Sequence, residues 1–196
     1  YKSKVILACD AVAAYTRCYK YKNGLSFYET SYSSSCREQL KYDVYCQNIE
    51  INSSAILCRR NVLNDINGFD PKFKRNQDYE FLIRLLNQGN VLAIDKPLYI
   101  MHVDSQSNQL TPTMYKKTRQ QFMKKFKLDI YRLNYIQKLN IWRFYHFDLG
   151  YYFFKNKMFV KALPHFLKSL PEPFLLIVVV KRFLRVYRFR RSNESQ

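Results

Sequence analysis

The clearest hydrophobic pattern in this chain begins near Asp78 and stops at Gly89. Its apolar residues recur at i, i+1, i+4 and i+5, which is the spacing of one face of an amphipathic helix. These residues are Phe81, Leu82, Leu85 and Leu86. We therefore predict a helix with Gly89 just beyond its end. Asp78 falls in its first turn, where the helix dipole favours a carboxylate, so this residue either stabilises the helix start or serves a reaction.

Apolar runs ahead of this helix predict two strands and a short helix. They cover residues 5–9, 49–58 and 59–65, and the short helix ends at Asn67-Gly68. Between the two strands, residues 19–45 are rich in Ser, Tyr and Lys and predict a surface loop with a short hairpin at Asn23-Gly24. The tyrosines and lysines of this segment suit contact with nucleic acid, but a solvated loop has the same composition.

After the central helix, residues 91–94 and 98–103 predict two strands. Asp95-Lys96-Pro97 is predicted to form the turn between them, because proline lacks the N–H that a strand ladder needs. From residue 113 the pattern is helical. The predicted helices cover residues 115–128, 130–139, 142–155 and 159–170. The last two form a hairpin whose spacing is close to that of a tetratricopeptide repeat, and we expect it to pack as a helical cap.

The tail combines seven apolar residues, 174–180, with the basic sequence KRFLRVYRFRR at 181–191. Seven apolar residues cannot span a bilayer, which needs about 20. A basic segment interleaved with apolar side chains suits an anionic membrane surface. A solvated basic tail and a basic arm that binds RNA are the alternatives.

Composition narrows the classes of function. The 196 residues carry a formal net charge of +18, which calls for an anionic partner such as nucleic acid, lipid headgroups or a nucleotide substrate. Only 4 glycines are present, too few for a glycine-rich phosphate loop. The 5 cysteines include no CxxC pair and predict reduced thiols in the cytosol. The first residue is Tyr1 and not methionine, so we expect a fragment of a longer protein.

The stretch NSSAILCRRNVLNDINGFDPKFKRNQDYEFLIRLLNQGNVLAIDKPLYIMHVDSQS resembles the second half of a bacterial family 2 glycosyltransferase of the GT-A fold. That family has a strand followed by Arg-Arg, a short helix and a Gly-Phe-Asp turn. A Gln77-Asp78 type pair then starts a helix, and a Pro-Leu-Tyr strand ends in a histidine or arginine and a serine-rich loop. The resemblance covers about residues 48–108, and it is carried by the whole series of motifs.

The resemblance implies that Asp78 is the general base that takes the proton from an acceptor hydroxyl during inverting sugar transfer. It also implies substrate contacts for Phe69, Asp70, Arg75, Gln77, His102, Ser105 and Ser107. Phe69 and Asp70 would line the acceptor side, while Arg75 and His102 would lie near the donor diphosphate. A solvated surface charge is the alternative for Arg75, and a polar strand end is the alternative for His102.

The family's first half, with the Asp-x-Asp motif that holds a divalent metal and the nucleotide sugar, has no counterpart here. We therefore expect a partial GT-A (Rossmann-like) α/β fold with a mixed sheet over residues 1–110, and a helical extension over residues 111–196. The complete enzyme would use Mg²⁺ or Mn²⁺, a nucleotide-sugar donor and a glycan or lipid-linked acceptor in surface polysaccharide synthesis. We expect this chain alone not to catalyse transfer, and to lie on the cytoplasmic face of the membrane.

A second hypothesis is a non-catalytic module that binds a membrane surface or another anionic partner through its basic helices and the tail at 174–191. RNA binding ranks last, since the sequence contains no recognisable RNA-binding motif.

Overall fold

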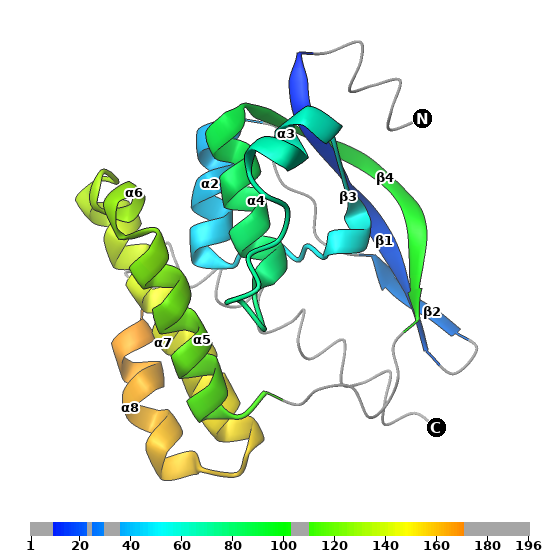
Figure 1. The fold of residues 1–196 in the computed structure, drawn as a ribbon. Helices are drawn as coiled ribbons and strands as arrows, with labels where there is room; N and C mark the ends of the chain where they lie inside the picture. The colour runs from blue at the N-terminus through cyan, green and yellow to red at the C-terminus, as the bar shows by residue number, and fades with distance from the viewer. Residues whose placement is uncertain (1–9, 23–24, 30–35, 103–109, 171–196) are drawn as a thin grey trace.

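The computed structural model describes residues 10–22, 25–29, 36–102 and 110–170 (Figure 1). Strand β1 (Ala11–Lys22) is the centre of a mixed sheet. Strand β4 (Asn90–His102) runs parallel to it, whereas β3 (Ile56–Cys58) and β2 (Leu25–Glu29) are antiparallel to it. Helices and a mixed sheet in one structure confirm the coarse α/β class.

The described helices that contact the sheet lie on one of its faces (Figure 1). Ala13 and Tyr15 of β1 face the helices and belong to the main core, whereas Ala14 packs with Leu92 and Ile94 on the opposite face. That opposite face also carries apolar side chains that are between 38% and 58% exposed. These are Tyr19, Leu57, Leu98 and Ile100.

The segment predicted as a loop, residues 19–45, is only partly a loop. The predicted hairpin is confirmed, because β1 and β2 pair with Lys22 opposite Leu25. The rest of the prediction is wrong, since α2 (Arg37–Cys46) is a helix whose Leu40 and Val44 are fully buried. Tyr45 and Cys46 complete its buried face, and contacts of α2 with α4 and α7 account for a helix in a segment of weak periodicity.

The predicted turn at Asp95-Lys96-Pro97 is also wrong, because β4 is a single strand. The strand is irregular at this point, because its register with β1 shifts. Thr16 pairs with Ile94 and Arg17 pairs with Pro97, so Asp95 and Lys96 bulge out of the ladder. Arg17 forms an ion pair with the bulged Asp95. A bulge accommodates the missing N–H of proline without ending the strand.

The predicted strand at 49–58 is shorter than expected. Only Ile56–Cys58 is a strand, because Ser53–Ala55 forms a short 3-10 helix, η1, ahead of it. The short helix that follows is confirmed as α3 (Arg60–Asp65), and the central amphipathic helix is confirmed as α4 (Gln77–Gln88). Between them, Asn67 and Gly68 both have positive φ values of 55° and 60°, as the predicted Asn-Gly turn requires.

The C-terminal part consists of α5 (Pro112–Lys125), α6 (Lys127–Tyr131), α7 (Tyr135–Lys155) and α8 (Phe159–Ser169). The predicted hairpin is confirmed as α7 and α8. The predicted helix over residues 130–139 is wrong, because Asn134 caps a new helix there. The Asn134 side chain accepts from the Gln137 N–H at 2.9 Å, and the Gln137 side chain accepts from the Asn134 N–H at 3.2 Å.

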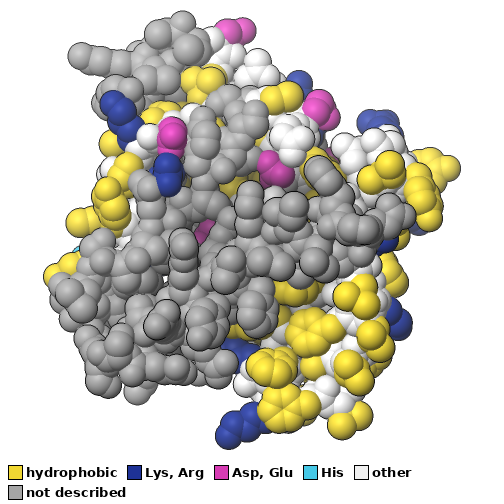
Figure 2. Space-filling model, turned by 180° about the vertical axis from the view of Figure 1, so that it is seen from behind, with side chains coloured by type: hydrophobic (Ala, Val, Ile, Leu, Met, Phe, Trp, Pro, Cys, Tyr) yellow, Lys and Arg dark blue, Asp and Glu magenta, His cyan; other side chains and the backbone are white. Residues whose placement is uncertain are grey.

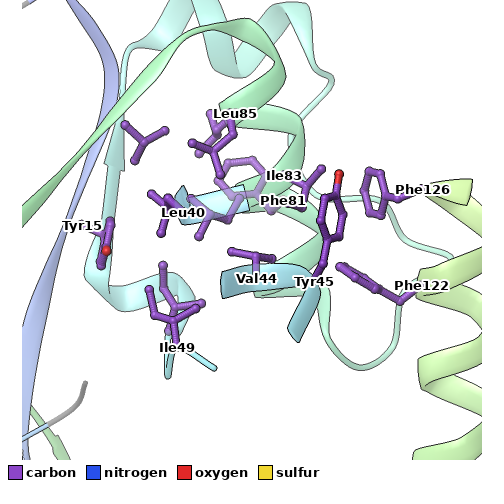
Figure 3. Close-up of a cluster of buried hydrophobic side chains, with 14 of the residues drawn as sticks. Tyr15, Leu40, Val44, Tyr45, Ile49, Phe81, Ile83, Leu85, Phe122 and Phe126 are labelled. Atoms are coloured by element: carbon purple, nitrogen blue, oxygen red, sulfur yellow. The ribbon is translucent and has the colours of Figure 1, made fainter. Parts of the chain in front are cut away.

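One hydrophobic core joins the sheet part to the C-terminal helices (Figure 3). Tyr15 of β1, Leu40 of α2 and Phe81 of α4 point toward it. Phe122 of α5 and Phe126 at its end pack on Tyr45 of α2, with ring centroids 6.3 Å away in each case. The division expected at residue 110 therefore separates segments that share this core.

Arg119 anchors α5 at the end of α2. It is 1% exposed, and its guanidinium donates to the backbone carbonyl of Tyr45 in the last turn of α2. A cation at this position suits both the unpaired carbonyl groups and the negative end of the helix dipole.

No helix in the described ranges has the length and apolar character needed to cross a membrane. The segments predicted as a strand at 5–9 and as a membrane-binding tail at 174–191 lie outside the described residues. None of the described cysteines, Cys18, Cys36, Cys46 and Cys58, forms a disulfide.

Gly89 provides a test of how α4 meets the sheet. Its φ of 173° is an extended conformation that any residue adopts, but a Cβ there would lie 2.6 Å from Cγ1 of Val12 on β1. We expect Gly89→Ala to lower the free energy of unfolding by about 1–3 kcal/mol through overpacking. Chemical denaturation measures the loss.

Val12→Ala removes the methyl group that the new Cβ would meet, so it is the matched control for this prediction. In a double-mutant cycle, Gly89→Ala should cost much less in the Val12→Ala background. An unchanged cost in that background would contradict the steric explanation.

Candidate functional site

Asp78 is the second residue of α4, as the sequence predicts. The helix begins after Asn76, whose φ of 57° turns the chain sharply into the first turn. The hydroxyl of Tyr79 donates to the Ile49 carbonyl at 2.9 Å and so fixes this turn against the segment that leads into η1. The start of α4 is therefore held in place by a side chain next to Asp78.

Few interactions of the described residues compensate the burial of the Asp78 carboxylate. Ser53 of η1 forms a side-chain and a backbone hydrogen bond with it, and both lower its pKa. Burial acts in the opposite direction and is the larger effect, so the pKa of Asp78 lies above its ordinary value. Its Oδ1 atom is buried and accepts no hydrogen bond from the described residues. Such an oxygen is expensive to keep in a folded protein, and it is available to accept a proton.

Residues of β4 support the Ser53 side of this site. The hydroxyl of Tyr99 on β4 donates to Oδ1 of Asn52 at 2.7 Å, and the Asn52 amide donates to the Met101 sulfur at 3.6 Å. Burial, the neighbouring Cys18 and the Asp78 charge raise the pKa of Tyr99, so its hydroxyl stays protonated and remains a donor. The strand β4 is thus linked through Asn52 to the residue that holds Asp78.

Glu80, two residues further along α4, shows how the fold treats a structural carboxylate. It is fully buried, and both of its oxygens are paired with Arg84, at 2.6 Å and 2.9 Å. Lys125 of α5 adds a third contact at 2.6 Å. A buried carboxylate needs such partners. The hydrogen bonds to Asp78 come from Ser53 and not from a cation, so the burial of Asp78 is compensated less than that of Glu80.

Phe69 and Gln77 lie close to the start of α4. The Phe69 ring stacks on Phe81, with centroids 4.3 Å apart, and is 43% exposed. Phe81 follows Asp78 by three residues, so Phe69 lies near the same side of α4 as Asp78. Gln77 is exposed beside Asp78, and Arg75 is partly exposed in the preceding turn. The exposed part of the Phe69 ring therefore offers an apolar surface near the start of α4.

Asp70 has structural partners. Its carboxylate accepts from Lys125 Nζ at 2.5 Å and from the Lys72 backbone N–H at 3.0 Å, and these two contacts lower its pKa. Lys125 bridges Asp70 and Glu80, so Asp70 ties the Gly-Phe-Asp turn to α5. Contact between Asp70 and an acceptor stays a prediction.

His102 is separated from Asp78 by the sheet. Tyr99 and Met101 face Asn52, and the alternation along a strand places the next side chain, His102, on the other face. There its ring meets the edge of Tyr21, with centroids 5.3 Å apart. Ser105 and Ser107 lie outside the described residues. The structure therefore does not bring His102 together with Asp78.

The expected Mg²⁺ or Mn²⁺ has no matching ligand set here. The chain contains no Asp-x-Asp, and the described residues contain no group of three or more His, Cys, Asp or Glu that could hold a metal ion. We therefore assign no step of the chemistry to a metal held by these residues.

Sequence reasoning missed Ser53, Asn52 and Tyr99 as parts of the site. The available signal was the polar triplet Asn52-Ser53-Ser54 inside an apolar run, which ends a strand and exposes backbone and hydroxyl donors. Tyr99 was noted only as a member of a motif, because its contact with Asn52 spans 47 residues of sequence.

Comparisons with protein-family models, with curated proteins and with solved structures each gave no match.

The first prediction for the site concerns stability. Because the folded protein raises the pKa of Asp78, charging this group opposes folding at neutral pH, and the penalty vanishes below the unfolded pKa of about 3.9. We expect Asp78→Asn to raise the free energy of unfolding at pH 7 by at most about 1 kcal/mol, because solvent screens part of the carboxylate charge. The gain should shrink as the pH falls through the raised pKa of folded Asp78 and approach zero below the unfolded value of about 3.9, as measured by denaturant titrations.

Glu38 is the matched control, since it is an exposed acid in the first turn of α2. Glu38→Gln should cost a few tenths of a kcal/mol at neutral pH, because an exposed acid there interacts favourably with the helix dipole. If Asp78→Asn is destabilising like Glu38→Gln, Asp78 is an ordinary stabiliser of its helix.

The second prediction concerns Ser53, whose hydrogen bonds lower the pKa of Asp78. Ser53→Ala removes the hydroxyl donor, so the pKa of Asp78 should rise further. The neighbouring Ser54→Ala, in the same turn, should leave it unchanged. A carbon-detected NMR titration of the Asp78 carboxyl group measures both, and equal effects would contradict the assigned hydrogen bond.

Proposed function

We propose that this chain is the acceptor-side half of an inverting glycosyltransferase, with Asp78 as the general base. The observation that carries the proposal is the desolvated Asp78 carboxylate, with a raised pKa and a buried Oδ1 that accepts no hydrogen bond from the described residues. The motif series around it, from Asn52 to His102, supports the same assignment by resemblance.

The proposed reaction needs a base because a sugar hydroxyl is not nucleophilic enough by itself. A hydroxyl group is a weak nucleophile, and a carboxylate within hydrogen-bond reach removes its proton as the new bond forms. The acceptor oxygen attacks the anomeric carbon of the donor sugar from the face opposite the nucleoside diphosphate. The carbon–oxygen bond to the diphosphate breaks, its electron pair leaves with the phosphate, and the proton remains on Asp78. The configuration of the sugar is inverted.

The environment of Asp78 matches this role. Partial burial raises its pKa and makes it a stronger base than an exposed aspartate. Ser53 holds the carboxylate in one orientation, and the exposed ring of Phe69 offers an apolar surface for the acceptor sugar. Arg75, in the turn before α4, is the candidate for contact with the departing diphosphate, since a cation stabilises that charge.

The donor-binding half with its Asp-x-Asp must come from elsewhere, on the same polypeptide or on a partner. Among the described residues the helices cover one face of the sheet (Figure 1), whereas parallel strand pairs such as β1 and β4 are normally covered on both faces, so a second layer is expected from elements outside these residues. The substrates would be a nucleotide sugar and a glycan or lipid-linked acceptor. The site of action would be the cytoplasmic surface of the membrane, where the net charge of +18 favours anionic headgroups.

The test is sugar transfer by the form of the protein that includes the donor half. Asp78→Asn should lower kcat by about 10²–10⁴-fold and leave the KM for the nucleotide sugar nearly unchanged, because the carboxylate acts only on the acceptor proton. Glu38→Gln, at the start of another helix, should retain full activity. A radiolabelled-donor assay measures these values.

Two outcomes would contradict the proposal. Full activity of Asp78→Asn would remove the general base and favour the non-catalytic alternative, in which charge reversal at 181–191 abolishes function instead. Robust turnover by residues 1–196 alone would show that the chain is more than an acceptor-side half.

A further inference from the structure

One exposed apolar surface of the described residues lies on α8. Val160 is 88% exposed, and four further large apolar side chains are between 57% and 59% exposed. These five residues, Phe159, Val160, Leu163, Leu167 and Leu170, are called the α8 apolar face below. At 3.6 residues per turn they occupy about a third of the helix circumference. Figure 2 shows apolar side chains gathered over the α7–α8 hairpin, at its lower right.

This face is not the side of α8 that holds the helix in the fold. A Cβ at Gly150 of α7 would lie 3.0 Å from the Phe166 ring, so the two helices pack closely there, and Ala162 and Ser169 are buried. The Nδ1 atoms of His165 and His146 are 2.8 Å apart across the same contact. The α8 apolar face is therefore available while α8 remains packed on α7.

The charges beside the α8 apolar face are all positive. Residues 155–170 contain four lysines, Lys155, Lys157, Lys161 and Lys168, and no Asp or Glu. Burial, followed by the charges of Lys168 and of Lys116 on α5, lowers the pKa of His165. The sequence that follows α8 continues through Pro171-Glu172-Pro173 to the apolar run at 174–180 and the basic run at 181–191.

The positive charges indicate which kind of partner could cover the α8 apolar face. A second copy would bring its own lysines against these lysines, and the chain's own basic tail would be repelled in the same way. Four of the five side chains of the α8 apolar face are aliphatic and offer no stacking surface for the bases of RNA, and Phe159 is the one aromatic ring in it. An anionic bilayer accepts both features, since the apolar side chains enter the interfacial region and the lysines reach the headgroups.

We propose that the α8 apolar face inserts into the interfacial region of an anionic lipid bilayer, with Lys161 and Lys168 at the headgroups. This surface is independent of the site at Asp78 and is distinct from the tail at 174–191. The sugar-transfer proposal therefore neither supports nor depends on it.

A fluorescent side chain at position 163 tests the insertion directly. Trp142 is the only tryptophan of the chain, so Trp142→Phe combined with Leu163→Trp leaves one reporter, on α8. With vesicles of phosphatidylcholine and phosphatidylglycerol, we expect the emission to shift to the blue and to be quenched by lipids brominated in the acyl chains. With pure phosphatidylcholine vesicles both effects should be much weaker.

Vesicle partitioning of the full chain tests the contribution of the face. Leu163→Gln with Leu167→Gln should weaken binding to the anionic vesicles by about tenfold or more, since two apolar side chains lose their burial. The matched control is Leu128→Gln with Ile136→Gln, two aliphatic residues that are 74% and 66% exposed near α6. This control should change partitioning by less than about twofold, and circular dichroism checks that both variants are folded.

Each other outcome would overturn the proposal. Binding through the tail alone would leave the reporter at position 163 unshifted and unquenched on anionic vesicles. A blue-shifted reporter without vesicles would show that protein covers the face, by the chain's own tail if independent of concentration, or by a second copy if concentration-dependent. Equal losses in the test and control variants would show that the α8 apolar face has no specific role.

Discussion

The fully buried carboxylate of Glu80 is the constraint on which the arrangement of the helices depends. Buried in the core side of α4, it is paired with Arg84 on the same helix and with Lys125 on α5. Arg84 also donates to the Ile66 carbonyl at 2.5 Å, and Lys125 also binds Asp70. One carboxylate thus fixes α4, α5 and the turn between α3 and α4, since each cation is required to compensate its burial.

The same helix turn treats Asp78 in the opposite way. Its partner is a serine from a short 3-10 helix, which orients the carboxylate without neutralising it. The charge of Asp78 is partly removed from water, and its Oδ1 atom has no hydrogen-bond donor among the described residues. A helix start that needed only a stabilising acid would leave that acid in solvent, where the dipole acts at no desolvation cost.

The apolar side chains near the sheet and those of α8 differ in how they are covered. Near the sheet, aromatic side chains of α2, α4 and α5 close one core, so the C-terminal helices complete the packing of the α/β part. At α8, one arc packs on α7 while a second arc, of larger residues, stays exposed beside lysines. The described residues leave the second arc exposed, and the proposed contact with an anionic bilayer would account for its apolar character.

The sequence by itself determined the elements that depend on local chemistry. The spacing of Phe81, Leu82, Leu85 and Leu86 defined α4 and placed Asp78 at its start, Asn67-Gly68 set a turn, and Asn156-Lys157 joined α7 to α8.

Only the tertiary structure decided the rest. It formed α2 from a segment with weak periodicity, kept β4 continuous through Pro97, and linked Tyr99 to Asn52 beside Ser53. It also separated His102 from Asp78 by the sheet. These features depend on contacts between residues far apart in the chain, where burial and pairing outweigh the local preferences that a sequence records.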